Sequence, residues 1–89
     1  MANIVATLKI LPDGIDIPSE ILMERIKEGL PEGITIHKFE EEPIAFGLVA
    51  TIVHLVFPED IPGGLESIEK YLSSIQGVGQ IDTIMVRRV

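Results

Sequence analysis

Hydrophobic and polar residues alternate with a period of two near the start of the chain, from Ile4 to Ile10. This period predicts a β-strand. The strand should end at Leu11-Pro12-Asp13-Gly14, because proline cannot donate to a strand ladder and Asp-Gly favours a turn. One face of the predicted strand carries Ile4, Ala6, Leu8 and Ile10, and the other carries Val5, Thr7 and Lys9.

Two later segments have apolar residues at helical spacing. The first predicted helix begins near Pro18, a residue suited to a first helical turn, and runs to about Gly29. The second follows Gly63-Gly64 and has Gly77 positioned as its C-cap. The apolar stripes are Ile21, Leu22, Ile26 and Leu30 in the first helix, and Leu65, Ile68, Leu72 and Ile75 in the second.

Three more strands are predicted, and one of them is unusually apolar. The strand from Leu48 to Phe57 is apolar on both faces apart from Thr51 and His54, which is typical of a central strand. Its bulkier residues are Val49, Val53, Leu55 and Phe57, and we assign these to the core side. His54 then points to the opposite face. The other two strands are Ile34 to about Phe39, closed by Glu40-Glu41-Glu42-Pro43, and Gln80 to Val86.

The predicted order of elements is strand, helix, strand, strand, helix, strand. This order is typical of the α+β, ferredoxin-like βαββαβ sandwich. Right-handed crossovers place both helices on one face of a four-stranded antiparallel sheet, with the strands in spatial order 4-1-3-2. The length predicts a single domain over residues 1–89. The fold alone predicts no function.

The composition restricts the class of partner. The chain has 14 acidic and 7 basic residues and a net charge of −7, which argues against direct binding of nucleic acid and favours a basic protein surface. It has no cysteine, and no window approaches the roughly 20 apolar residues that span a bilayer. The first residues lack the blocks of a signal peptide. We therefore expect a cytoplasmic protein that does not bind membranes.

The chain lacks the motifs of most reaction classes. His37 is predicted to lie at the surface and His54 on the open sheet face, with no cysteine to complete a zinc site. Gly63-Gly64 is not followed by the lysine and hydroxyl residue of a phosphate-binding loop. We therefore predict no catalytic residue, no metal site and no cofactor, and expect that the protein is not an enzyme.

Two features stand out against this background. The turn before the apolar strand carries Phe46, flanked by Ala45 and Gly47, where a hairpin connection is normally polar. Phe46 either folds back to cap the core or is held out, partly exposed, for a partner. Arg87 and Arg88 make the end of the sequence basic, and either lie free, pair with nearby acids or bind a partner. Strand counting puts these features at opposite ends of the sheet, which favours an extended contact over a compact one.

The chain also resembles a known family over its whole length: archaeal elongation factor 1-beta and the C-terminal exchange domain of its eukaryotic counterpart. The segment from Glu41 to Ala50 is the most specific part of the resemblance. The other matching segments are Val5-Ala6-Thr7-Leu8-Lys9-Ile10, Gly63-Gly64, Ile75-Gln76-Gly77-Val78 and Val86-Arg87-Arg88.

The resemblance implies a guanine-nucleotide exchange factor for the GTPase elongation factor 1-alpha, and we expect it to be a monomer when free. In eukaryotic relatives, a phenylalanine in a Gly-Phe-Gly turn packs into a pocket of the GTPase, and a penultimate lysine reaches toward its magnesium and phosphates. Phe46 and Arg88 take these positions. The partner-binding residues implied in this chain are Ala45, Phe46, Gly47, Arg87, Arg88 and Val89.

The chain departs from the eukaryotic pattern in three places. Ala45 replaces the first glycine of the turn, Arg88 replaces the lysine, and Val49 and Ala50 stand where those relatives have two lysines. Another class of function also fits the topology: a regulatory domain that binds a small molecule and works as a dimer through its open sheet face. An enzyme like acylphosphatase is a third alternative, but Leu11-Pro12-Asp13-Gly14 replaces the arginine-containing phosphate loop.

Overall fold

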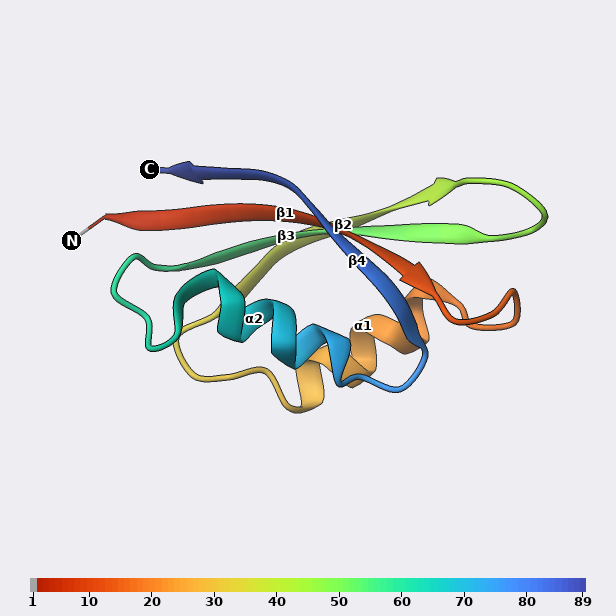
Figure 1. Cartoon of the computed structure of the whole chain (residues 1–89), viewed down its shortest axis with the longest axis horizontal. Coiled ribbons are helices and arrows are strands. Elements are labelled where there is room, and N and C mark those ends of the chain that lie inside the picture. Colours follow the sequence, from red (N-terminus) through yellow and green to blue (C-terminus); the bar gives the residue numbers. More distant parts are fainter. Residues whose placement is uncertain (1) are drawn as a thin grey trace.

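The computed structural model describes residues 2–89 and has six elements along the chain (Figure 1). The first strand continues two residues beyond its predicted end at Ile10, into the predicted break, and ends at Pro12. In chain order the elements are β1 (Asn3–Pro12), α1 (Ser19–Glu28), β2 (Thr35–Pro43), β3 (Val49–Pro58), α2 (Gly64–Ser73) and β4 (Val78–Arg88).

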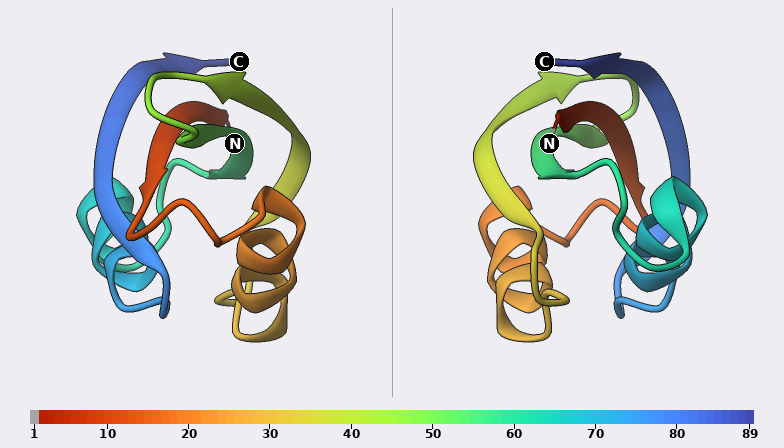
Figure 2. Two further views of the ribbon diagram at one scale, coloured as in Figure 1. Left: turned by 90° about the vertical axis from the view of Figure 1, so that its right-hand side faces the viewer. Right: turned by 90° about the vertical axis from the view of Figure 1, so that its left-hand side faces the viewer.

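The four strands form one antiparallel sheet in the order β2-β3-β1-β4, which is the predicted order read from the other edge. The central strands are β3 and β1, as the apolar character of β3 predicted. Both helices cover one face of the curved sheet and leave the other open (Figures 1 and 2). The ferredoxin-like α+β fold is therefore confirmed.

The core lies between the sheet and the helices, and the alternating residues of the central strands fill it. The core side predicted for β3 is confirmed for Val53, Leu55 and Phe57, whereas Val49 is half-buried and lies outside the core cluster. Fully burying one large apolar side chain, such as leucine or phenylalanine, contributes about 1.5–3 kcal/mol to the stability of the fold. Buried core residues from the central strands are Ala6, Leu8, Ile10, Val53, Leu55 and Phe57, and those from the helices include Leu22, Met23, Ile26, Ile68 and Leu72.

The predicted apolar stripe of α1 was wrong at one position. Ile21 is exposed, and Met23 is buried in its place. The buried residues of α1 are Ser19, Leu22, Met23 and Ile26, which follow the i, i+3, i+4, i+7 spacing of one helical face. Since Ser19 is polar, this face could not be recognised from apolar residues alone. Both helices are ten residues long, and within residues 2–89 no helix has the length and apolar character needed to cross a membrane.

Both edge strands are longer than predicted. β2 continues through the glutamates that were expected to close it, because Glu40, Glu41 and Glu42 pair with β3. β4 runs from Val78 to Arg88. An edge strand needs only one backbone partner, and its side chains can stay in water. Charged residues therefore did not mark the ends of these strands.

The prediction that Gly77 caps the second helix was also wrong. The helix ends at Ser73, with Ser74 as its C-cap, and Gly77 lies in the connection to β4 with φ 102°. A Cβ atom at Gly77 would lie 3.1 Å from Cδ2 of Leu22. The glycine therefore permits both this backbone conformation and the close packing of the connection on α1.

Candidate functional site

Phe46 lies at the tip of the β2–β3 hairpin, in a turn closed by two backbone hydrogen bonds. The N–H of Ile44 donates to the carbonyl of Leu48 at 2.9 Å, and the N–H of Leu48 donates to the carbonyl of Ala45 at 2.9 Å. The central residues of the turn, Phe46 and Gly47, have φ angles of 53° and 80°. Positive φ at both central positions is the pattern of a type I′ hairpin turn, which favours asparagine and glycine.

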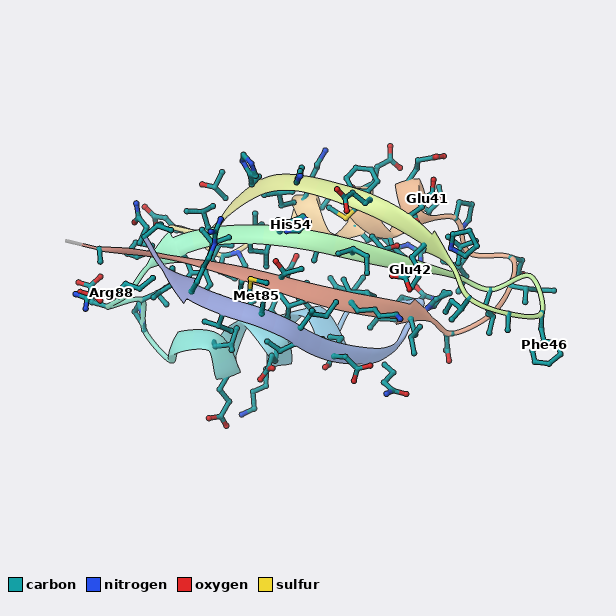
Figure 3. All side chains as sticks on the ribbon, turned by 90° about the horizontal axis from the view of Figure 1, so that it is seen from above. Glu41, Glu42, Phe46, His54, Met85 and Arg88 are labelled. Atoms are coloured by element: carbon teal, nitrogen blue, oxygen red, sulfur yellow. The ribbon has the colours of Figure 1, made fainter. Side chains whose placement is uncertain are left out.

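Phe46 is the non-glycine residue with positive φ among residues 2–89, and its side chain is 95% exposed. Figure 3 shows the ring projecting beyond the end of the hairpin. This left-handed conformation costs an ordinary residue about 1–2 kcal/mol. The exposed ring does not cap the core, so the packing of this chain does not explain it. Strain and exposure at one aromatic residue are characteristic of a binding position.

A second apolar side chain accompanies Phe46 at this end of the molecule. Ile15, in the loop between β1 and α1, is 71% exposed, and a Cβ atom at Gly47 would lie 4.0 Å from its Cγ2. Ile15 was not predicted as a site residue. The sequence does contain a signal for it, because Ile15 is a large apolar residue directly after the turn residues Pro12-Asp13-Gly14, just as Phe46 is an apolar residue in a turn. The candidate surface therefore extends from the hairpin to the adjacent loop.

The other side of the turn borders a hollow of about 480 Å³. Leu11, Ile44, Ala45 and Leu48 contribute apolar surface to it. Ala50, where the eukaryotic pattern has a lysine, is fully buried, and Val49 is half-buried. The surface beside Phe46 is therefore mainly apolar at the start of β3.

Arg87 and Arg88 lie on opposite faces of the sheet. Arg87 pairs with Val5 and Arg88 with Ile4, and directly opposed residues share a face. Ile4 packs against the core on the helix side, whereas Val5 and Arg87 line a hollow of about 420 Å³ on the open face. The two arginines were predicted as one basic feature, but the structure separates them. They cannot enter the same site in a partner from the same side.

Arg88 forms an ion pair with Glu59, which lies between β3 and α2. Its Nε atom lies 3.0 Å from Oε2, and its Nη2 donates to Oε1 at 3.3 Å. The next residue, Val89, is fixed by its backbone: its N–H donates to the carbonyl of Asn3 at 2.8 Å, and the N–H of Asn3 donates back at 3.2 Å. The end of β4 is therefore ordered up to Val89, whose side chain is exposed. Glu59 was not singled out in the sequence, since nothing local marks it as the partner of Arg88.

The histidines do not form a metal site with their neighbours. His37 is exposed on β2, as predicted. His54 lies on the open face, also as predicted, where its Nδ1 lies 2.9 Å from the hydroxyl of Thr7 and its Nε2 lies 3.9 Å from Oε2 of Glu40. Residues 2–89 contain no group of three or more His, Cys, Asp or Glu side chains that could hold a metal ion.

Comparisons with known proteins identify the family of this chain. Residues 5–89 match the family model described as the EF-1 guanine nucleotide exchange domain. Elongation factor 1-beta of Methanothermobacter thermautotrophicus is 47% identical over 89 residues, which is 100% of this chain and 99% of that protein. The same factor from Methanobrevibacter smithii is 42% identical, and that from Staphylothermus marinus is 40% identical, each with the same coverage.

A solved structure supports the fold independently. The C-terminal domain of the MgtC protein from Mycobacterium tuberculosis matches with a TM-score of 0.58 over 98% of this chain and 87% of that one. Its sequence identity is 16%, so it informs the fold alone. The full-length matches to archaeal factors, together with the family match, show that this chain belongs to the EF-1 guanine nucleotide exchange domain family and has a nucleotide-exchange role in translation elongation.

Proposed function

We propose that this chain binds elongation factor 1-alpha and promotes the exchange of its GDP for GTP through two contacts. The first is the hairpin turn formed by Ala45, Phe46 and Gly47. The second lies at the end of β4, where Arg87 and Arg88 extend from opposite faces of the sheet and Val89 follows. The observation that carries the proposal is the strained, 95% exposed Phe46 in a chain whose family is an exchange domain.

The turn serves as an anchor. A large aromatic side chain that loses all its solvent contact in a partner's pocket commonly contributes 2 kcal/mol or more to binding. The positive φ angles of Phe46 and Gly47 direct the ring away from the sheet, so little of the hairpin has to reorganise on binding. Apolar neighbours such as Ile15 and Ile44 then exclude water around the ring.

The end of β4 acts on the nucleotide site. Arg88 presents a guanidinium that can hydrogen-bond to phosphates or carboxylates. If it enters the region where magnesium bridges the phosphates, it competes with the ion and weakens nucleotide binding. By thermodynamic linkage, a factor that binds the nucleotide-free GTPase more tightly must lower the affinity for nucleotide by the same factor. The factor therefore accelerates release without a chemical step of its own.

The electrostatics support a protein partner. The net charge of −7 favours approach to a basic surface and opposes direct contact with nucleic acid. We propose a cytoplasmic, monomeric, single-domain factor that needs no cofactor and is not an enzyme. The alternative of a dimeric small-molecule-binding domain is not favoured, since the family match covers residues 5–89.

The test is the release of fluorescent GDP from the purified elongation factor 1-alpha of the same organism, measured with excess unlabelled nucleotide. We expect this chain to accelerate release with saturable dependence on its concentration. A sedimentation measurement on the free chain tests the monomer. Release at the intrinsic rate at every concentration of the chain contradicts the proposed function.

A further inference from the structure

We propose that Glu59 is a positioning residue for Arg88. It holds the guanidinium in one orientation, so that the remaining N–H groups face outward toward the GTPase. This inference rests on the proposed function, because it concerns how Arg88 meets the nucleotide site. It adds a residue outside both contacts described above.

The contact between the two side chains is side-on. The Nε atom of Arg88 lies 3.0 Å from Oε2 of Glu59, and its Nη2 donates to Oε1 of the same carboxylate at 3.3 Å. A guanidinium has five N–H donors in a fixed plane, and two of its nitrogen atoms, Nε and Nη2, face the carboxylate. The N–H groups on Nη1 and on the free side of Nη2 point away from the carboxylate. Because the group is planar, holding one edge fixes the direction of the other.

Both partners are attached to ordered backbone. Glu59 directly follows Pro58, which pairs with Asn3 at the end of β3, and its N–H donates to the carbonyl of Ala2 at 3.2 Å. Arg88 pairs with Ile4, and Val89 is hydrogen-bonded to Asn3 in both directions. The two side chains therefore approach each other from neighbouring, fixed positions at one end of the sheet. Their pairing requires no movement of the chain.

The ion pair is exposed, so Glu59 leaves the Arg88 guanidinium accessible to a partner. The Arg88 side chain remains 69% exposed and that of Glu59 36% exposed. An ion pair this exposed contributes little to folding. Its effect is instead to restrict the rotamers of a long, flexible side chain before binding, which reduces the entropy lost when the guanidinium is fixed in a partner.

The neighbouring charges do not share this arrangement. Asp60 follows Glu59 in the same loop but forms no ion pair within residues 2–89, and neither does Arg87 on the open face. Glu59→Gln and Asp60→Asn remove one negative charge each from adjacent positions. The two variants therefore have the same net charge, and differ in whether Arg88 keeps its carboxylate partner.

The test is the rate of GDP release measured against the concentration of each variant at one ionic strength. We expect Glu59→Gln to lower the saturating rate by about two- to tenfold, as estimated from the cost of immobilising one long side chain. The half-saturating concentration should change little. Asp60→Asn should match the wild type in both quantities. Glu59→Gln should have no further effect in an Arg88→Ala background, because its role requires Arg88.

A second measurement follows the side chain directly. In the free chain, the NMR signal of the Arg88 Nε–H group should show restricted motion, and that restriction should be lost in Glu59→Gln but kept in Asp60→Asn. A saturating rate that is unchanged or raised in Glu59→Gln overturns the positioning role, and so does an equal loss with and without Arg88. If the wild-type chain itself fails to accelerate release, the proposed function fails, and this inference fails with it.

Discussion

Phe46 and Arg88 lie at opposite ends of the molecule, as Figure 3 shows along its long axis. The molecule extends 43 × 22 × 18 Å, and the sheet runs along the longest dimension. The start of β3 pairs with the end of β1, whereas the end of β4 pairs with its start. A GTPase that contacts both residues must therefore extend along the sheet, and the rigid sheet fixes the separation between its two contacts.

Replacing Phe46 should affect exchange and leave folding nearly intact. Phe46→Ala removes a fully exposed ring, so thermal stability should change little. The concentration needed for half-maximal exchange should rise by a factor that corresponds to about 2 kcal/mol or more. Phe46→Asn separates the two effects further. Asparagine tolerates positive φ better than phenylalanine, so this variant should stabilise the turn, yet it should weaken exchange because the ring is missing. Thermal unfolding and GDP release, measured on the same samples, show whether Phe46 acts in exchange or in folding. Loss of stability with normal exchange in the remaining folded protein would indicate a structural role.

The sequence predicted the parts of this architecture that depend on local patterns. The period-two alternation of β1, the apolar β3 and the helical stripe of α2 predicted the elements, and right-handed crossovers between them then predicted the order of the strands. That order predicted that Phe46 and Arg88 lie at opposite ends of the sheet. The unusual Phe46 turn was also visible, because an aromatic residue replaces the polar residues that a hairpin connection normally contains.

The parts that could not be predicted depend on contacts between distant segments. Glu40–Glu42 belong to β2 because β3 pairs with them, although nothing in their composition favours a strand. The opposite orientation of Arg87 and Arg88 follows from the extension of β4 to Arg88 along β1, since consecutive residues of a strand face opposite sides, and the strand was predicted to end at Val86. The pairing of Glu59 with Arg88 spans 29 positions and leaves no local pattern.

The buried hydrogen bond between Thr51 and Ser19 joins β3 to α1. The Thr51 hydroxyl donates to Ser19 Oγ at 2.7 Å, and the two residues are 0% and 2% exposed. Thr51→Val keeps the shape of the side chain but leaves the Ser19 hydroxyl buried without this partner, which should cost about 1–3 kcal/mol of unfolding free energy. Urea unfolding of the single variant and of the double variant with Ser19→Ala measures the effect.

The double variant should recover part of the loss, because it leaves no polar atom unpaired at this position. If the single and double variants lose the same free energy, the cost comes from packing and the hydrogen bond contributes nothing measurable.

The Tyr71 hydroxyl donates to the carbonyl of Ile26 at 2.6 Å and so joins α2 to α1. Burial raises the pKa of Tyr71 above its usual 10.0, and the negative charge of Glu28 adds to this, while a backbone hydrogen bond from Gly29 opposes it. The folded state thus favours the neutral phenol. Its contribution to stability is fully present below pH 10 and is lost as the pH rises through the folded-state pKa.

Tyr71→Phe removes this hydrogen bond and should lower the unfolding free energy by about 1 kcal/mol at neutral pH. The difference between wild type and Tyr71→Phe should shrink as the pH rises above 10. Urea unfolding at several pH values checks this trend. Since Tyr71 is the one tyrosine in the sequence, phenolate absorbance reports its ionisation directly. A difference that stays constant through this ionisation would show that the hydrogen bond is not coupled to folding.

Arg88 should contribute to exchange more than to folding. Its side chain is 69% exposed and its ion pair with Glu59 is solvated, so Arg88→Ala should shift thermal stability by less than about 1 kcal/mol. The rate of GDP release at saturating factor should fall, since the cation that reaches the magnesium region is missing. Arg88→Lys should restore much of the rate, because the eukaryotic pattern has lysine at this position, although an ammonium cannot reproduce the side-on contact with Glu59.

A matched control separates this local effect from long-range attraction. Lys27→Ala removes one positive charge from the exposed surface of α1 and should leave the saturating rate unchanged. Arg87→Ala should instead raise the half-saturating concentration, because Arg87 faces the open side of the sheet and cannot reach the same point as Arg88. All variants must be compared at one ionic strength, since salt slows the encounter of charged proteins. A saturating rate that Arg88→Ala leaves at the wild-type value would remove Arg88 from the mechanism and leave the Phe46 turn as the principal contact.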